Sequence, residues 1–211
     1  MKQNVMKHLL FIIIALVFTS CGVTSFNVYT FNLTEVQKPC LADQAQDDRV
    51  VITDLQQDKE GRYTFEDEYI KITWEPGNKQ FRLWLTNKSV NSMQIPWDNA
   101  GYVDYTGNVG RVIHSGAKNP NDLQPPITIP GGTILSDVLI PADKWYSVII
   151  PTKEVNAWIR SGLTKVQAAN PVYIGKSIAF LLPIIIRGVQ NDYLFTFDIG
   201  QKAVNAGDIE F

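Results

Sequence analysis

Residues 70–86 have the sequence IKITWEPGNKQFRLWLT, which decides the fold class. Apolar and polar residues alternate over 70–74 and again over 81–86, which is the period of a strand with one buried face. Between the two runs, Glu-Pro-Gly-Asn places Pro and Gly at the second and third positions of a four-residue turn, as a type II turn requires. We therefore expect a β-hairpin, with Trp84 on the face opposite its apolar neighbours.

Further short runs of β-branched or aromatic residues are separated by Gly, Pro, Asn and Asp. They lie at residues 50–55, 63–65, 93–97, 102–105, 111–114, 127–129, 134–140, 145–150, 177–187 and 193–199. Strands at this spacing predict an antiparallel β-sandwich, and we expect an immunoglobulin-like one over residues 49–211. One short helix is expected at residues 153–161, because Thr152 can cap it and apolar residues recur there at helical spacing. This all-β pattern excludes a doubly wound α/β fold.

The chain begins with the pattern of a secretory signal peptide. Lys2 and Lys7 give a positive start, residues 9–18 form an unbroken apolar run, and small residues follow. Ten apolar residues in a helix rise about 15 Å, whereas the core of a bilayer is about 30 Å thick. We therefore predict a cleaved leader over residues 1–20 and not a membrane-spanning helix.

A cysteine directly follows this leader. Residues 17–21, VFTSC, resemble the lipobox of bacterial lipoproteins. The resemblance implies that the leader is cut before Cys21, that the Cys21 thiol carries a diacylglyceryl group, and that the protein is anchored in the bacterial cell envelope. Two or three acyl chains hold a protein stably on a membrane. In the sorting rule of that family an Asp after the cysteine favours the inner membrane, so Gly22 favours the outer one.

Two alternatives for the same cysteine stay open. Cys21 could follow an ordinary secretory signal by chance, or it could form a disulfide with Cys40 in an oxidising compartment. Residues 21–48 are polar and weakly patterned, so we expect a lipid anchor and tether there, with at most a short edge strand at residues 27–32. The hairpin around residues 69–86, the strand at 111–114 and the C-terminal hairpin resemble those of envelope lipoproteins that carry an immunoglobulin-like domain and have no assigned role.

Composition argues against several classes of function. The 211 residues carry a formal net charge of -2 and show no basic stripe, so nucleic acid is not an expected partner. The sequence contains no G-x-S-x-G elbow, no G-x-G-x-x-G loop and no Walker-type loop. Once the leader and Cys21 are set aside, His114 and Cys40 are the only histidine and cysteine, so we expect no metal site and no cofactor.

His114 and pairs of acidic residues are the candidates for catalysis. His114 could act as the general base of an envelope hydrolase, and the competing interpretation is a histidine at a strand end that makes only structural hydrogen bonds. Asp98 with Asp104, or Asp137 with Asp143, could perform glycoside hydrolysis if their carboxylates are suitably spaced. The sequence does not fix that spacing, so no catalytic residue is assigned.

Aromatic residues are the candidates for ligand contact. Trp84 points away from its apolar neighbours, and Trp97 is followed by Asp98 and lies near Tyr102 in sequence. Flat rings beside Asp and Asn side chains suit sugar binding, and the same rings also suit a protein interface or a hydrophobic core. We therefore name Trp84, Trp97, Asp98 and Tyr102 as candidate ligand contacts.

These observations predict a lipid-anchored cell-envelope protein that binds or scaffolds and does not catalyse. Its expected partners are the membrane, through the lipid on Cys21, and either a second envelope protein or a glycan. A glycan-binding module that uses exposed aromatic residues is the first alternative, and an envelope hydrolase is the second.

Overall fold

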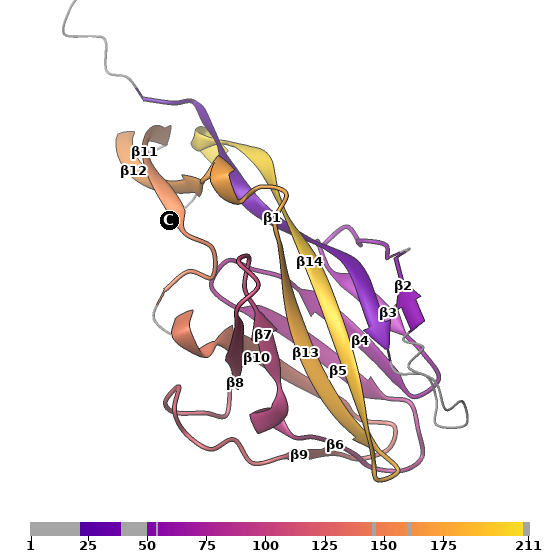
Figure 1. Cartoon of the computed structure of the whole chain (residues 1–211). Helices are drawn as coiled ribbons and strands as arrows, with labels where there is room; N and C mark the ends of the chain where they lie inside the picture. Colours follow the sequence, from indigo (N-terminus) through magenta and orange to yellow (C-terminus); the bar gives the residue numbers. More distant parts are fainter. Residues whose placement is uncertain (1–21, 39–49, 54, 145–146, 160–161, 209–211) are drawn as a thin grey trace, which may run out of the picture. The chain divides into compact units, whose positions relative to one another are not determined.

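The computed structural model describes residues 22–38, 50–53, 55–144, 147–159 and 162–208 (Figure 1). The structure confirms the all-β class, with antiparallel strands in a 12-stranded sheet and a separate two-stranded sheet. The chain divides into two compact units, and the smaller one contains residues 22–28, 153–159, 162–169 and 203–208 of the described chain. The larger unit contains the other described residues, including every candidate site discussed below.

The strands of the large sheet follow the order β2, β1, β14, β13, β7, β8, β10, β5, β4 and β3. In that order their bounds are Val50–Ile52, Ser25–Lys38, Val189–Asn205, Ser177–Ile186, Gly101–Val103, Val109–His114, Ile134–Pro141, Phe81–Asn87, Ile70–Glu75 and Tyr63–Glu66. Two further strands, β6 (Met93–Ile95) and β9 (Ile127–Ile129), pair with each other, and β6 also pairs with β13.

The remaining elements are short. Strands β11 (Thr152–Ile159) and β12 (Gly162–Ala169) form the two-stranded sheet. Four single turns of 3-10 helix occur among the described residues, at Trp97–Asn99 (η1), Ala142–Lys144 (η2), Pro171–Tyr173 (η3) and Ala206–Asp208 (η4). Within the described segments no helix has the length and apolar character needed to cross a bilayer.

The hairpin predicted at residues 70–86 is confirmed as β4 and β5. The two strands are antiparallel, and Trp74 is paired with Leu83. Inward-facing residues alternate with outward-facing ones along both strands, so Trp74 and Leu83 are fully buried while Trp84 is only half-buried on the other face. The period of two in the sequence therefore sets which side chains face the core and which face solvent.

A single aromatic core joins the two halves of the large sheet. The ring of Trp74 on β4 lies 5.7 Å from Phe180 on β13 and 5.1 Å from Phe195 on β14, measured between ring centres. Phe81 on β5 lies 4.8 Å from Phe180. Because β4 and β5 come from one end of the strand order and β13 and β14 from the other, the sheet folds over so that its two halves face each other as a sandwich (Figure 1). The immunoglobulin-like topology stays a prediction.

The prediction of a tether over residues 21–48 is wrong for its first part. Residues 25–38 form the 14-residue strand β1, which pairs with β14 and β2. Phe31 and Leu33 are buried, and the close approach to β14 depends on Gly200, where a Cβ atom would lie 2.5 Å from Thr30 Oγ1. Thr and Asn side chains occupy other positions of this strand, so the sequence lacks a clear apolar alternation there. The partner strand β14 also lies far away in the chain. Residues 39–49 lie outside the described residues.

The short helix predicted at residues 153–161 is also wrong, because β11 occupies this segment as far as Ile159. Val155 is half-buried and Ala157 is buried, whereas Glu154 and Asn156 are exposed, so the described side chains follow the period of two of a strand. Ala157 and Val166 are buried together with Ala206 in a small second core. Pairing with β12 thus outweighs the local helical signal.

Candidate functional site

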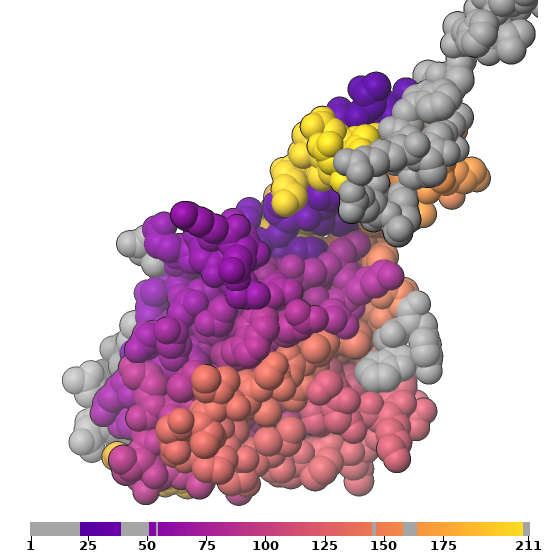
Figure 2. Space-filling view, turned by 180° about the vertical axis from the view of Figure 1, so that it is seen from behind, coloured from indigo at the N-terminus to yellow at the C-terminus, as the bar shows by residue number. Residues whose placement is uncertain are grey.

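The outer side of β3, β4, β5 and β10 carries three rows of side chains that cross the strands. We call this surface the Trp84 face, and Figure 2 views the molecule from the side of these strands. The strand register places the rows as Arg62, Glu75, Arg82 and Val138; then Thr64, Thr73, Trp84 and Ser136; then Glu66, Lys71, Thr86 and Ile134. Arg62 directly precedes β3, and none of these residues is buried.

Trp84 lies in the middle row between two guanidinium groups. The Cζ atom of Arg62 is 5.0 Å from the centre of the indole ring, and that of Arg82 is 6.0 Å from it. Such cation–π contacts hold an exposed ring in place at a modest gain in free energy, about 0.5–1 kcal/mol each. On the same row, the hydroxyl oxygens of Thr64 and Thr73 are 3.0 Å apart. The indole is therefore fixed in position on a surface of small hydroxyl side chains.

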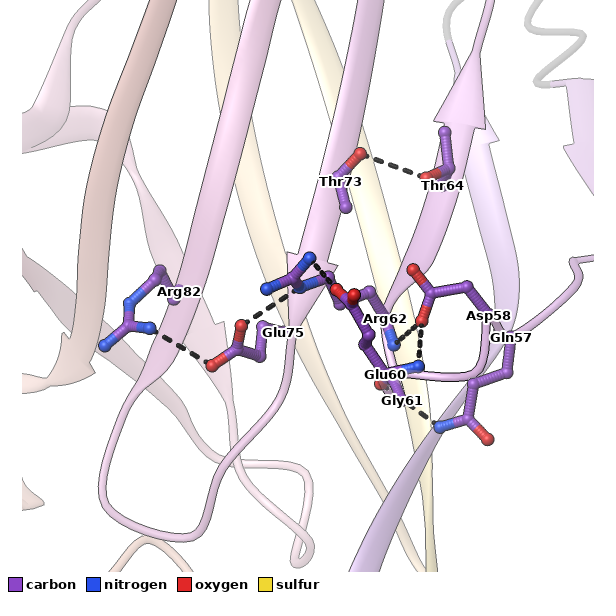
Figure 3. Close-up of polar contacts among 9 residues, drawn as sticks. All are labelled: Gln57, Asp58, Glu60, Gly61, Arg62, Thr64, Thr73, Glu75 and Arg82. Carbon is purple, nitrogen blue, oxygen red and sulfur yellow. Dashed lines mark hydrogen bonds and ion pairs between the residues drawn. The ribbon is translucent and has the colours of Figure 1, made fainter.

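Glu75 orders both arginines (Figure 3). Its Oε2 accepts a hydrogen bond from Arg62 Nε at 3.1 Å, and its Oε1 accepts one from Arg82 Nη1 at 3.2 Å. Arg62 also forms an ion pair with Glu60. The hydrogen bond to Glu75 raises the pKa of the Arg62 guanidinium, so this charge is permanent. One carboxylate on β4 thus bridges a cation beside β3 and a cation on β5, the two strands that flank β4.

The turn before β3 positions Arg62. Asp58 Oδ1 accepts hydrogen bonds from the backbone N–H groups of Glu60 and Arg62, at 2.8 and 2.9 Å. Gly61 lies between them with φ of 81°, a conformation that glycine adopts without strain. Gln57 Nε2 closes the turn by donating to the carbonyl oxygen of Gly61 at 3.1 Å (Figure 3).

A hollow of about 420 Å³ adjoins the Trp84 face at the β4–β5 turn. It is lined by Glu75, Pro76, Gly77, Asn78, Lys79, Gln80 and Arg82. The Asn78 side chain fastens this turn to the segment before β11, because its Oδ1 accepts from Ile150 N at 3.1 Å and its Nδ2 donates to Ile150 O at 3.2 Å. Glu75 and Arg82 belong to both the face and the hollow, so the two form one continuous surface.

Trp97 and Tyr102, two of the residues proposed as ligand contacts, are in the core. Trp97 is 0% exposed and Tyr102 is 2% exposed, so neither ring reaches the surface. Trp97 opens the short helix η1, which turns its ring inward to stack on His114 with ring centres 4.8 Å apart. Burial raises the pKa of the Tyr102 hydroxyl, as expected for a phenol among apolar neighbours.

Asp98, the fourth proposed contact, is at the surface but serves another set of interactions. Its carboxylate pairs with Arg111 at 2.5 Å and accepts a hydrogen bond from Gln124 N at 3.1 Å. The hydrogen bond from Arg111 lowers the pKa of Asp98. Arg111 also donates to the carbonyl oxygens of Pro120 and Asp122. These contacts fix the loop between β8 and β9 and lie outside the rows of the Trp84 face.

His114 has a carboxylate partner. Both side chains are buried, and His114 Nδ1 lies 3.1 Å from Asp137 Oδ2. Asp137 Oδ1 accepts a further hydrogen bond from Ser115 N at 2.9 Å. Gly116 N also approaches Nδ1, at 3.2 Å. A carboxylate can only accept, so the contact with Asp137 places the proton on Nδ1. In that tautomer Nδ1 cannot also accept a hydrogen bond from Gly116 N–H, although Gly116 N lies within reach.

The surroundings of His114 enclose its ring. The indole of Trp97 lies parallel to one face of the imidazole, with 6° between the ring planes. A Cβ atom on Gly116 would lie 2.4 Å from His114 Cε1, so only glycine fits beside the ring. Gln124 binds the backbone at the end of β8, because its Nε2 donates to Val112 O at 2.8 Å and its Oε1 accepts from His114 N at 2.9 Å. The buried side chains of His114, Asp137 and Gln124 therefore hold the loop between β8 and β9 against the end of β8.

The acid pairs considered for glycoside hydrolysis have other partners. Asp104 accepts from the backbone N–H groups of Thr106 and Asn108 in its own turn, and Asp143 pairs with Lys144 at 2.8 Å. Asp98 and Asp137 have the partners given above. Among the residues that the structure describes, no cluster of three His, Cys, Asp or Glu side chains could hold a metal ion. Cys21 and Cys40 lie outside the described residues.

Sequence reasoning found Trp84 but missed its neighbours. Arg82 is two residues before Trp84 and shares its face by the same period of two, so this contact could have been predicted. Arg62 and Glu75 reach the site through the pairing of β3 with β4 and of β4 with β5, which no local pattern reveals. The chain has no match among protein-family models, curated proteins or solved structures.

Proposed function

We propose that this protein is a lipid-anchored component of the cell envelope that acts by binding, and that the Trp84 face is its binding surface. The observation that carries the proposal is the half-buried indole of Trp84, flanked by Arg62 and Arg82 and adjoining a hollow. Tryptophan and arginine are the residue types that contribute most to binding surfaces, and ligand sites are typically concave with a few polar groups.

The anchor rests on the motif at residues 17–21, and Gly22 favours the outer membrane. Radiolabelled palmitate should enter the full-length chain in growing cells. The Cys21→Ala variant should lose the label, because the thiol that accepts the lipid is gone. Label that persists in this variant would contradict the anchor, and an oxidised Cys21–Cys40 pair seen by mass spectrometry would favour the disulfide.

The binding surface can be tested in living cells with a photo-crosslinking amino acid. Ser136 is exposed and is paired with Trp84 across β10 and β5, so a benzophenone there would point over the face. Leu123 is 86% exposed on the loop between β8 and β9 and serves as the matched control. We expect covalent adducts from position 136 and none from position 123. No adduct, or equal adducts from both positions, would contradict the assignment of this face.

A hydrolase remains the second candidate, and the buried His114–Asp137 pair is the observation in its favour. We propose a structural role for this pair instead, because Trp97 and Gly116 enclose the imidazole and its side chain is 7% exposed. The test is hydrolysis of nitrophenyl esters and glycosides by the wild-type chain. Turnover that disappears in His114→Gln would support the hydrolase.

A further inference from the structure

We infer that the Trp84 face binds an acidic saccharide, with a sugar ring on Trp84 and a carboxylate of the sugar chain on Arg82. This inference rests on the proposed binding function and names the class of ligand. It depends on three features of the described residues: the charge left unbalanced at the hollow, the polar character of the face, and the place of Arg82 between the ring and the hollow.

The hollow has an excess of positive charge. Lys79 and Arg82 line it together with a single acid, Glu75, and Glu75 also binds Arg62. Lys79 forms no ion pair with any described residue, and Arg82 uses only Nη1, in its bond to Glu75. The chain as a whole carries a formal net charge of -2, so this positive region stands out from its background. Charge complementarity therefore favours an anionic ligand.

Arg82 is suited to a carboxylate. Guanidinium groups bind carboxylates through two parallel hydrogen bonds when both nitrogens of one edge are free. Glu75 Oε1 engages one nitrogen of Arg82, and the side chain of Arg82 is 43% exposed. A ligand carboxylate can therefore bind the remaining N–H groups without breaking the bridge between Glu75 and Arg62.

The composition of the face favours a sugar over a protein. The cores of protein interfaces are depleted in Lys and Glu, yet Glu66, Lys71 and Glu75 lie in the rows beside Trp84. The row of Trp84 itself carries the hydroxyl groups of Thr64 and Ser136. A sugar ring has an apolar C–H side that packs on an indole and a rim of hydroxyl groups that exchange hydrogen bonds with such side chains.

Arg82 connects the two parts of the site. Its guanidinium carbon is 6.0 Å from the centre of the Trp84 ring, and the residue also lines the hollow. A sugar that packs on the indole can therefore place a carboxylate on the guanidinium of Arg82, which lies beside the ring. Arg62 is held on the other side by Glu60 and Glu75, so it orders the indole and is not the anion site.

The experiment measures binding to the full-length chain, expressed with its own leader and purified in detergent. The probes are a hexamer of galacturonic acid, neutral cellohexaose of the same length, and poly-glutamate as an acidic chain without sugar. Isothermal titration calorimetry gives the affinities. The variants are Arg82→Gln and Trp84→Ala. The matched control is Arg187→Gln, because Arg187 also lies over an aromatic ring, 5.6 Å from Tyr69.

We expect the galacturonate hexamer to bind, and Arg82→Gln to weaken binding at least about tenfold, the effect of losing a hydrogen bond to a charged group. Trp84→Ala should abolish binding, Arg187→Gln should leave it within about twofold, and added salt should weaken it. Neither cellohexaose nor poly-glutamate should bind comparably. Circular dichroism and the unfolding midpoint of each variant confirm that the fold is intact.

Several outcomes would overturn the inference. Equal binding of cellohexaose, with no effect of Arg82→Gln, would show a neutral glycan and leave the proposed binding function in place. Equal binding of poly-glutamate would show an anion site without sugar selectivity. Failure of all probes would reject the acidic saccharide, while crosslinking from position 136 would still decide separately whether the face binds a partner.

Discussion

Replacing Asp137 by Ala should destabilise the fold strongly, because the Asp137 carboxylate accepts hydrogen bonds from His114 and Ser115 at the end of β8. Its side chain is 2% exposed, and it accepts from Val138 N, its neighbour in the chain, at 2.7 Å. It also accepts from two donors outside its own strand, Ser115 N at 2.9 Å and His114 Nδ1 at 3.1 Å. Each buried donor left without a partner costs about 1–3 kcal/mol. The two donors together give about 2–6 kcal/mol, which agrees with the about 3–5 kcal/mol observed when one partner of a buried pair is removed.

Asp137→Asn separates the loss of an acceptor from the loss of a charge. The Asn side-chain oxygen can still accept from Ser115, and its NH₂ group can donate to His114 Nδ1 if the ring carries its proton on Nε2 instead. We therefore expect Asp137→Asn to cost about 1–2 kcal/mol, less than the Ala variant, since the hydrogen-bond count is kept while one charge is lost.

The assay is urea denaturation followed by tryptophan fluorescence, with Asp137→Ala, His114→Ala and the double variant measured together. Residues in direct contact show coupling free energies of about 0.5–3 kcal/mol in such a cycle. A loss below about 1 kcal/mol for Asp137→Ala would refute the reasoning, given the cost of stranded buried donors. Strict additivity of the two single variants would refute the hydrogen-bonded pair itself.

Three further predictions concern neighbouring sites. Gly116→Ala should cost about 1–3 kcal/mol in urea denaturation, because its Cβ would lie 2.4 Å from Cε1 of the buried His114 ring and the ring would have to shift; an unchanged midpoint would contradict this packing. Trp97→Ala should cost about 3–5 kcal/mol, whereas Trp84→Ala should cost about 1 kcal/mol or less, and similar losses at both positions would contradict their different burial. Asp98→Asn should lower stability at neutral pH, because the folded-state pKa of Asp98 is depressed. The deficit should begin to shrink as the pH falls below about 4, the pKa of an unfolded Asp, and should vanish only below the lowered pKa of the folded state; unfolding midpoints with a constant deficit across pH would contradict this.

Local signals in the sequence were enough for the hairpin of β4 and β5. Alternation in each strand and a turn of Pro and Gly lie within residues 70–86, so no distant contact is needed to define them. Strand β1 shows the opposite case. The partner strand β14 begins only at Val189. The residues of β1 that face β14 include Thr and Asn, so the sequence of β1 has the polar composition of a tether. Long-range pairing decides such segments, and sequence patterns do not record it.

Some positions of the candidate site can likewise be predicted from local sequence, and others depend on long-range contacts. The outward direction of Trp84 follows from the period of its own strand, but nothing in the local sequence decides between a ligand contact and a core position for Trp97 and Tyr102. A single turn of helix at η1 directs Trp97 inward and leaves Asp98 outside. Asp137 is 23 residues from His114, and only the pairing of β8 with β10 brings the two together.

The first described residues already form backbone hydrogen bonds, which bears on how a lipid-anchored protein would move on the membrane. Val23 is already fixed, since its N–H donates to Asn156 O at 2.9 Å, and β1 follows at Ser25. If Cys21 carries the proposed lipid, Gly22 alone separates the acylated residue from the first pairing contact, and one residue spans at most about 3.6 Å. The compact unit that contains Val23 would then stay next to the acylated residue. The protein would travel with its lipids in the plane of the bilayer and meet its ligand by lateral diffusion.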